Sequence, residues 1–206
     1  MIIIMQLTAL VNLYYWFFGW DFFTALGIPM AAMKPLTAFL FVITGIMVLA
    51  MILNYNKEIK SKLTIYVVSS VSATIFIVVF FTLLIFAIDE TIVVKELTLT
   101  KDEGPYTIAG YMPSIVALIG FLITYVIGVV YLYNTTRCEP RMKWLSMCLI
   151  AIGLSALIGY VLVIPELFFY SEDLGSNAMA VSTAICFIIA GVLFYLVSKK
   201  CLKKNV

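Results

Sequence analysis

The 206-residue sequence has no histidine and few charged residues. The absence of histidine excludes imidazole-ligated haem, His-containing zinc sites, Ser-His-Asp and Cys-His nucleophile systems and a phosphoaccepting histidine. Charged residues make up only 12% of the chain, about half of the share in soluble domains. In contrast, 64% of the residues are apolar or aromatic and the mean hydropathy is +1.13. So little polar surface cannot cover a water-soluble globule, and we expect most of the chain to lie in lipid.

Six stretches are long and apolar enough to cross a bilayer, which takes about 20 residues in a helix. They cover 2–20, 35–54, 63–88, 112–133, 144–169 and 178–198. The first lacks a basic n-region and a small-residue cleavage site, so we interpret it as a retained helix rather than a signal peptide. The sequence predicts an all-α polytopic membrane protein, with residues 1–206 forming a single transmembrane domain and an external loop, including a short β-hairpin, at 89–111.

Loop charges predict the orientation of these spans. Ten of the thirteen Lys and Arg residues lie in 54–62, in 134–143 and after residue 198, accompanied only by Glu58 and Glu139. The remaining nine acids lie on the opposite face, and basic loops stay on the cytoplasmic side. We therefore expect a multi-pass protein of the cell (plasma) membrane with both termini cytoplasmic. The basic tail is expected to meet anionic lipid at that face, although ordinary stop-transfer flanking explains it equally well.

The second and sixth predicted spans share five identities at one spacing. They are Met33, Thr37, Ala38, Phe41 and Gly45 in the second span, and Met179, Thr183, Ala184, Phe187 and Gly191 in the sixth. The fourth span keeps Ala117 at the equivalent offset and little else. The pattern predicts three repeated helical hairpins, of which the middle one has diverged most.

Two segments carry a resemblance to a known family. Phe18-Gly19-Trp20-Asp21, Gly27-Ile28-Pro29 and residues 33–41 resemble the polytopic membrane input region that precedes PAS and kinase modules in archaeal and bacterial sensor histidine kinases. Gly159-Tyr160, Ile164-Pro165-Glu166-Leu167 and residues 179–191 are similar to its closing repeat. The resemblance implies a sensor of an unidentified signal, without catalytic residues. No effector module follows Ser198 here, so we expect such a sensor to act through another polypeptide.

Small residues at four-residue spacing form two ladders. One consists of Gly120, Thr124 and Gly128, and the other of Ala151, Ser155 and Gly159. Such ladders let helix backbones approach closely, and packing within the bundle is their commonest use. A ladder on the outside of the bundle would instead bind a partner.

Two polar residues are candidate sites. Asn12 shares a helix face with Thr8, and such side chains usually join helices rather than bind ligands. Glu166 follows the helix-breaking Pro165, and we favour an interfacial helix end over a cation or proton site. The four cysteines form no CxxC motif, so no metal or other cofactor is expected.

These observations favour a non-enzymatic protein without nucleic-acid partners. The first hypothesis is an integral membrane accessory subunit that packs against other integral membrane proteins, for example in a respiratory or ion-translocating redox complex. The alternative is a stand-alone sensor module that signals to a separate kinase. A small-solute transporter is supported only by the repeat architecture.

Overall fold

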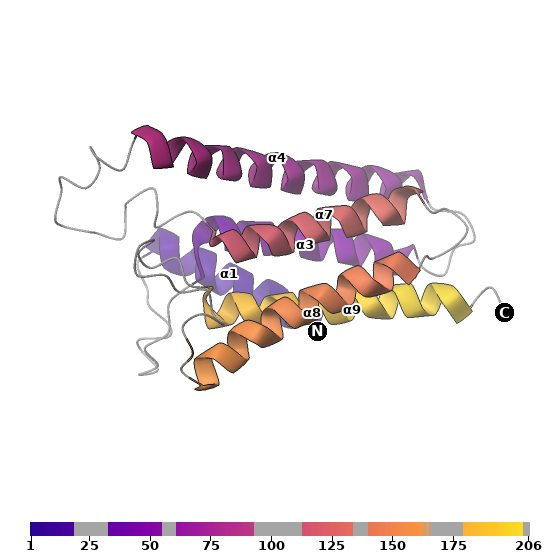
Figure 1. Ribbon diagram of the computed structural model, residues 1–206. Helices are drawn as coiled ribbons and strands as arrows, with labels where there is room; N and C mark the ends of the chain where they lie inside the picture. The colour runs from indigo at the N-terminus through magenta and orange to yellow at the C-terminus, as the bar shows by residue number, and fades with distance from the viewer. Residues whose placement is uncertain are drawn as a thin grey trace.

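The computed structural model describes residues 1–18, 33–54, 61–92, 113–133, 140–162, 164 and 179–203. These residues form six helices: α1 (Ile2–Phe18), α3 (Pro35–Leu53), α4 (Lys62–Ile92), α7 (Ile115–Tyr133), α8 (Pro140–Leu162) and α9 (Val181–Lys203). The helices run alternately in opposite directions along one bundle (Figure 1). We call the end at which α3, α7 and α9 begin the Met33 end, and the opposite end the Lys62 end.

Five of the six helices are long and apolar enough to cross a membrane. The exception is α1, whose 17 residues span about 26 Å at 1.5 Å per residue, slightly less than the roughly 30 Å hydrocarbon layer. The prediction of an all-helical multi-pass membrane protein is therefore confirmed for five spans. The first predicted span is confirmed as an apolar helix.

Several predicted boundaries are wrong. Helix α9 continues to Lys203, five residues past its predicted end, and Ile164 is not helical although the fifth span was predicted to include it. Helix α4 continues to Ile92, so residues 89–92 are helical although the sequence suggested a loop.

Helix α8 begins at Pro140, four residues before its predicted start, because proline suits the first turn of a helix. The backbone N–H groups of that turn have no hydrogen-bond partner within the helix, so the absence of an N–H in proline costs nothing there. The extensions of α4, α8 and α9 were missed because hydropathy marks the apolar crossing and not the helix that extends beyond it. Residues 93–111, with the predicted β-hairpin, lie outside the described residues.

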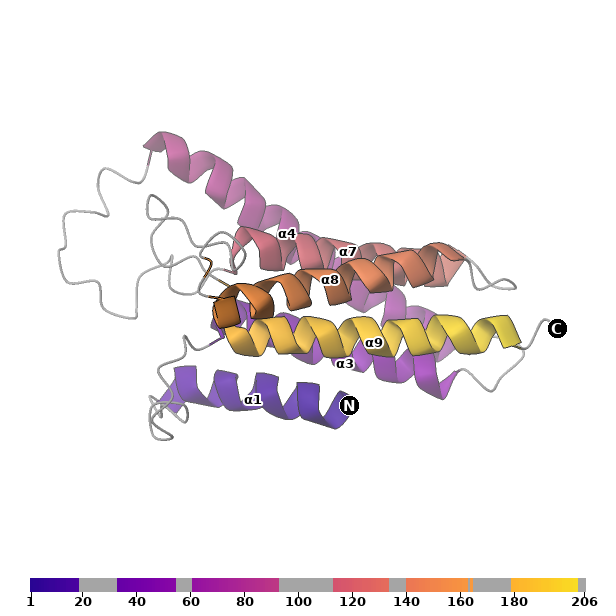
Figure 2. The ribbon, with the colours of Figure 1, turned by 60° about the horizontal axis from the view of Figure 1, so that its bottom comes forward.

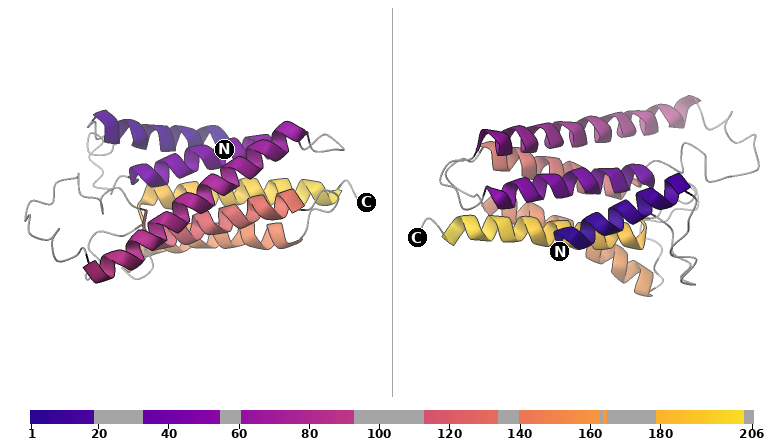
Figure 3. Two further views of the ribbon diagram at one scale, coloured as in Figure 1. Left: turned by 90° about the horizontal axis from the view of Figure 1, so that it is seen from above. Right: turned by 180° about the vertical axis from the view of Figure 1, so that it is seen from behind.

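The helices form an inner group of three and an outer group of three. Helix α1 packs on α3 and α9, α4 packs on α7 and α3, and α8 packs on α9 and α7, so each outer helix contacts two inner ones (Figure 2). Helix α4 crosses the bundle obliquely (Figure 3, left). Within the apolar spans, 61% of α9 and 50% of α3 is buried, against 28% of α4 and of α8. The outer helices thus present most of the exposed surface.

The core of the bundle is filled mainly by large side chains of the inner helices. Among the largest that are fully buried are Phe41, Phe121, Phe187, Phe194, Met47 and Leu118. Lipid tails are as apolar as these side chains, so close packing and hydrogen bonds hold transmembrane helices together more than the hydrophobic effect does. The fit between side chains therefore decides how the helices are arranged.

Candidate functional site

Three phenylalanines, one from each inner helix, meet at the centre of the bundle. The ring centroids of Phe41 and Phe121 are 4.9 Å apart, those of Phe41 and Phe187 are 4.9 Å apart, and those of Phe121 and Phe187 are 5.2 Å apart. Such tilted pairs contribute about 0.5–1.5 kcal/mol each beyond the area that they bury. We call this group the phenylalanine triangle, and it joins α3, α7 and α9.

Because Gly120 has no side chain, one ring of the triangle can lie directly against α7. A methyl group on Gly120 would lie 2.5 Å from Cε1 and Cζ of Phe187, closer than van der Waals contact allows. Gly120 itself is buried. The first member of the predicted α7 ladder therefore serves the packing of α7 against α9.

All ten residues of the repeat motif are buried. Its two glycines face the outer helix of their own hairpin: a methyl group on Gly45 would meet Gln6 of α1, and one on Gly191 would meet Ile150 of α8. Gln6 also donates a hydrogen bond from Nε2 to the backbone oxygen of Val42, 3.1 Å away. The motif thus lies where α3 and α9 pack against their preceding helices.

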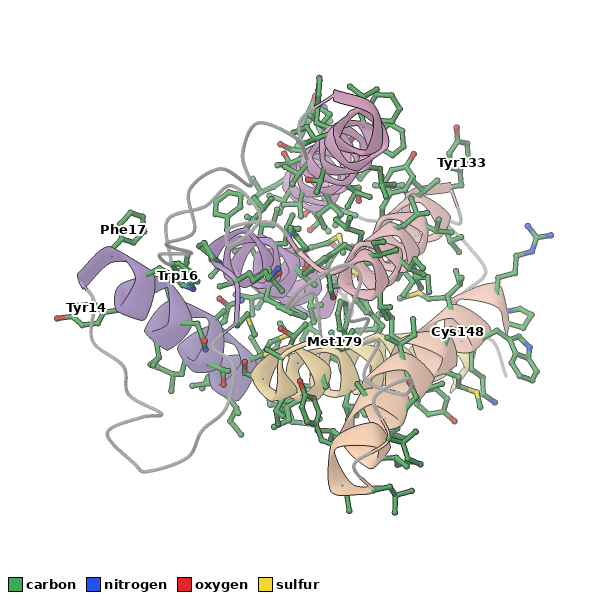
Figure 4. All side chains as sticks on the ribbon, turned by 60° about the vertical axis from the view of Figure 1, so that its left-hand side comes forward. Tyr14, Trp16, Phe17, Tyr133, Cys148 and Met179 are labelled. Carbon is green, nitrogen blue, oxygen red and sulfur yellow. The ribbon has the colours of Figure 1, made fainter. Side chains whose placement is uncertain are left out.

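At the Met33 end, side chains of α1 hold the backbone that leads into α3. Asn12 Oδ1 accepts a hydrogen bond from the backbone N–H of Met33, and Trp16 Nε1 donates one to the Met33 oxygen, both at 2.8 Å. In Figure 4, Trp16 points toward the bundle whereas Tyr14 and Phe17 point away from it. Asn12 therefore joins α1 to the segment that leads into α3.

A second contact of the same kind lies at the start of α9. The Tyr160 hydroxyl of α8 donates a hydrogen bond to the backbone oxygen of Met179 at 2.7 Å. Both contacts link an aromatic donor near the end of an outer helix to the methionine that opens the repeat motif. We call them the outer clamps. The sequence pattern did not single out Trp16 and Tyr160 as functional residues, although Trp16 follows the buried Asn12 by four residues and Tyr160 directly follows the buried Gly159.

The two predicted ladders are placed differently. Gly120, Thr124 and Gly128 are all buried in α7, and Thr124 Oγ1 donates to the Gly120 oxygen at 3.0 Å. A methyl group on Gly128 would meet Ser72 of α4 and Met47 of α3. This ladder therefore lies entirely inside the bundle.

In α8 only one of the three ladder residues is buried. Ala151 is exposed and Ser155 is half-buried, while Gly159 is buried. The buried face of α8 also includes Gly153 and Ala156, and a methyl group on Gly153 would lie 2.5 Å from the backbone oxygen of Ala184. The buried and the exposed face of α8 both follow alternating spacings of three and four residues, so spacing alone does not identify the buried face.

A buried polar cluster joins three helices at the Lys62 end. Asn54 Oδ1 accepts the backbone N–H of Ser61 at 2.8 Å, and Asn54 also hydrogen-bonds Tyr131 of α7. Ser61 Oγ accepts the N–H of Thr64 at 3.2 Å, which caps the first turn of α4. The cluster fixes the ends of α3, α4 and α7 relative to one another.

One lysine at the Met33 end has a shifted pKa. Lys34 precedes α3 and lies just outside the apolar span that begins at Pro35. Burial lowers the pKa of Lys34 from its usual value of 10.5, because a buried site disfavours the charged form.

The described residues contain no group of three or more His, Cys, Asp and Glu side chains that would hold a metal ion. Cys186 is buried in α9, and Cys148 is exposed on α8 (Figure 4). The candidate Glu166, with Pro165, lies outside the described residues. The site geometry is thus one of helix packing: a triangle, two clamps and a polar cluster.

Comparisons with protein-family models, with curated proteins and with solved structures give no significant match to this chain.

Proposed function

We propose that the protein is a non-catalytic integral membrane accessory subunit that packs against other membrane proteins, for example in a respiratory or ion-translocating redox complex. One observation carries the proposal. The outer helix α4 exposes three small residues within its apolar span, two of them serines, and no side-chain hydrogen bond joins these serines to another helix in the described part of the chain.

The residues are Ser69, Ser70 and Ala73, all exposed on α4, and we call them the α4 small face. Large apolar residues such as Phe80 and Phe81, each more than half exposed, suit contact with lipid tails. Serine hydroxyls gain nothing from hydrocarbon, whereas a partner helix can approach small residues closely and accept their hydrogen bonds. The face therefore favours a protein neighbour over lipid.

We further propose six crossings, α1 included, with both termini on the cytoplasmic side of the cell membrane. The distribution of Lys and Arg supports this orientation. A slightly short helix such as α1 is accommodated by local thinning of the bilayer at modest cost.

The three-hairpin repeat is part of the same proposal. A Phe-x-Ile sequence occurs once in each inner helix, at Phe41, Phe121 and Phe187, and these three residues form the triangle. In α7 it follows the equivalent alanine, Ala117, by four residues, one more than in the other two helices. Each hairpin consists of an outer helix followed by the inner helix on which it packs most extensively. These features support three copies of one unit arranged around the triangle.

The test is purification of tagged protein from native membranes in mild detergent, followed by native electrophoresis and mass spectrometry. We expect a fixed set of membrane proteins to co-purify in constant ratio. The double variant Ser69→Leu/Ala73→Leu should lose them, because leucine prevents close approach. Ala151→Leu, which places the same bulk on the exposed face of α8, is the matched control and should retain them.

Each other outcome changes the conclusion. Loss of the partners by Ala151→Leu alone would place the docking face on α8 and contradict the argument from α4. If the protein migrates alone, the accessory function is wrong, and the sensor module that signals to a separate kinase becomes the hypothesis to test by ligand screening.

A further inference from the structure

The start of α8 combines basic and aromatic side chains at the Lys62 end. Arg141 and Trp144 are exposed, Trp144 to 66%, and Lys143 is half-buried. Lys143 Nζ lies 5.7 Å from the centroid of the Tyr195 ring of α9, within the range of a cation–π contact. The first turn of α8 contains no acidic residue.

Helix α9 runs antiparallel to α8 and packs closely on it, and the sequence that flanks the two helices at this end is basic. Together, residues 134–143 and 199–206 contain seven Lys and Arg and one acidic residue, Glu139. This excess of basic residues in the flanking sequence suits an anionic ligand.

An apolar track continues from this charged group along the exposed face of α8. Trp144 is followed at spacings of three and four residues by Met147, Ala151 and Leu154, all exposed. Tryptophan is enriched at the level of lipid headgroups, and the rest of the track lies deeper in the apolar span. A ligand that fits both parts has an anionic head and a long apolar tail.

We propose that Arg141, Lys143 and Trp144 form a binding site for an anionic phospholipid. Arg141, on the same face of α8 as Trp144, binds the headgroup phosphate, Lys143 adds positive charge beside it, and an acyl chain lies along the exposed face of α8. The Tyr195 ring restricts Lys143 before the lipid binds, which reduces the entropy lost on binding. The proposal requires that α8 spans the membrane, and it is independent of any protein partner.

The test measures binding of phosphatidylglycerol to the purified full chain in uncharged detergent, by native mass spectrometry across a lipid titration. Arg141→Gln and Lys143→Gln should each weaken binding about fivefold, the factor that corresponds to about 1 kcal/mol per charge at a lipid surface. Lys62→Gln is the matched control, because Lys62 is an exposed lysine at the same end, on α4. It should change binding less than twofold.

Three results would overturn the proposal. The first is an equal loss in all three variants, which would mean general attraction between charges. The second is equal retention of phosphatidylcholine by the unaltered protein. The third is equal protection against thermal unfolding by inorganic phosphate at the same ionic strength, which would mean that the acyl chain contributes nothing. Native electrophoresis of each variant confirms that a loss of lipid does not reflect unfolding.

Discussion

Replacing Gly120 by alanine tests the phenylalanine triangle directly. Two effects of opposite sign compete. Alanine favours a helix over glycine by about 1 kcal/mol, but its methyl group would lie 2.5 Å from two atoms of the Phe187 ring. That ring is held between Phe41 and Phe121, with centroids 4.9 and 5.2 Å away, so it cannot move aside without disturbing both.

The magnitude follows from these two terms. Overpacking a tightly filled core typically costs about 1–3 kcal/mol, and in this site the upper part of that range applies because the ring is rigid and enclosed. After the gain in helix propensity, we expect Gly120→Ala to lower the free energy of unfolding by about 1–2 kcal/mol.

A double-mutant cycle separates this collision from any general effect of the substitution. Phe187→Leu alone loses two ring contacts and should destabilise the bundle by about 1–3 kcal/mol. It also vacates the space that the new methyl group needs, so Gly120→Ala/Phe187→Leu should be more stable than the sum of the single effects by about 1 kcal/mol or more. The measurement is reversible unfolding in mixed micelles with increasing SDS. Additivity within about 0.5 kcal/mol would refute the geometry of the triangle.

Further variants test the clamps, the cap and the shifted lysine. Tyr160→Phe removes one hydrogen bond and should cost about 0.5–1.5 kcal/mol in the same unfolding assay; an unchanged midpoint would contradict the clamp. Asn12→Leu leaves a buried N–H unpaired and should cost about 1–3 kcal/mol, with Val11→Leu, on an exposed position of the same helix, as control. Ser61→Ala should cost about 1 kcal/mol through loss of the cap and speed hydrogen exchange in the first turn of α4, but not in α7. Burial lowers the pKa of Lys34 in the folded protein below 10.5, so on raising the pH the folded protein loses this proton before the unfolded chain does. The free energy of unfolding should therefore rise with pH between the folded-state pKa and 10.5. Lys34→Met should lack this rise, and a pH profile identical to that of the unaltered protein would refute the argument.

Hydropathy predicted the helices well and their ends poorly. The apolar runs identified all six helices, because a residue in hydrocarbon must be apolar whatever its neighbours are. Helix ends depend instead on capping residues and on contact of the backbone with water, and for this reason α4 extends to Ile92 and α8 begins at Pro140. Neither signal is contained in an average over 20 residues.

The site was predicted in part, for a related reason. The repeat motif marked residues that are all buried, because its spacing of four residues follows one face of a helix. Which face of α8 turns inward could not be predicted, since Ala151 and Gly153 are both small and only the contact of Gly153 with α9 distinguishes them. The Trp16 and Tyr160 clamps join residues 17 and 19 positions apart, across segments whose path the sequence does not specify.

The burial of the motif also limits what the family resemblance implies. Met33, Thr37 and Phe41 lie in the segment that resembles sensor input regions, and all three are buried and face other helices of this bundle. Residues that only pack against one another constrain the fold and not the ligand or partner, so a shared motif of this kind predicts a shared bundle. Specific function must then depend on the exposed surfaces, chiefly the α4 small face and the start of α8. Two chains with the same motif can therefore differ in function, and the variants of the α4 small face are the ones that separate an accessory subunit from a sensor.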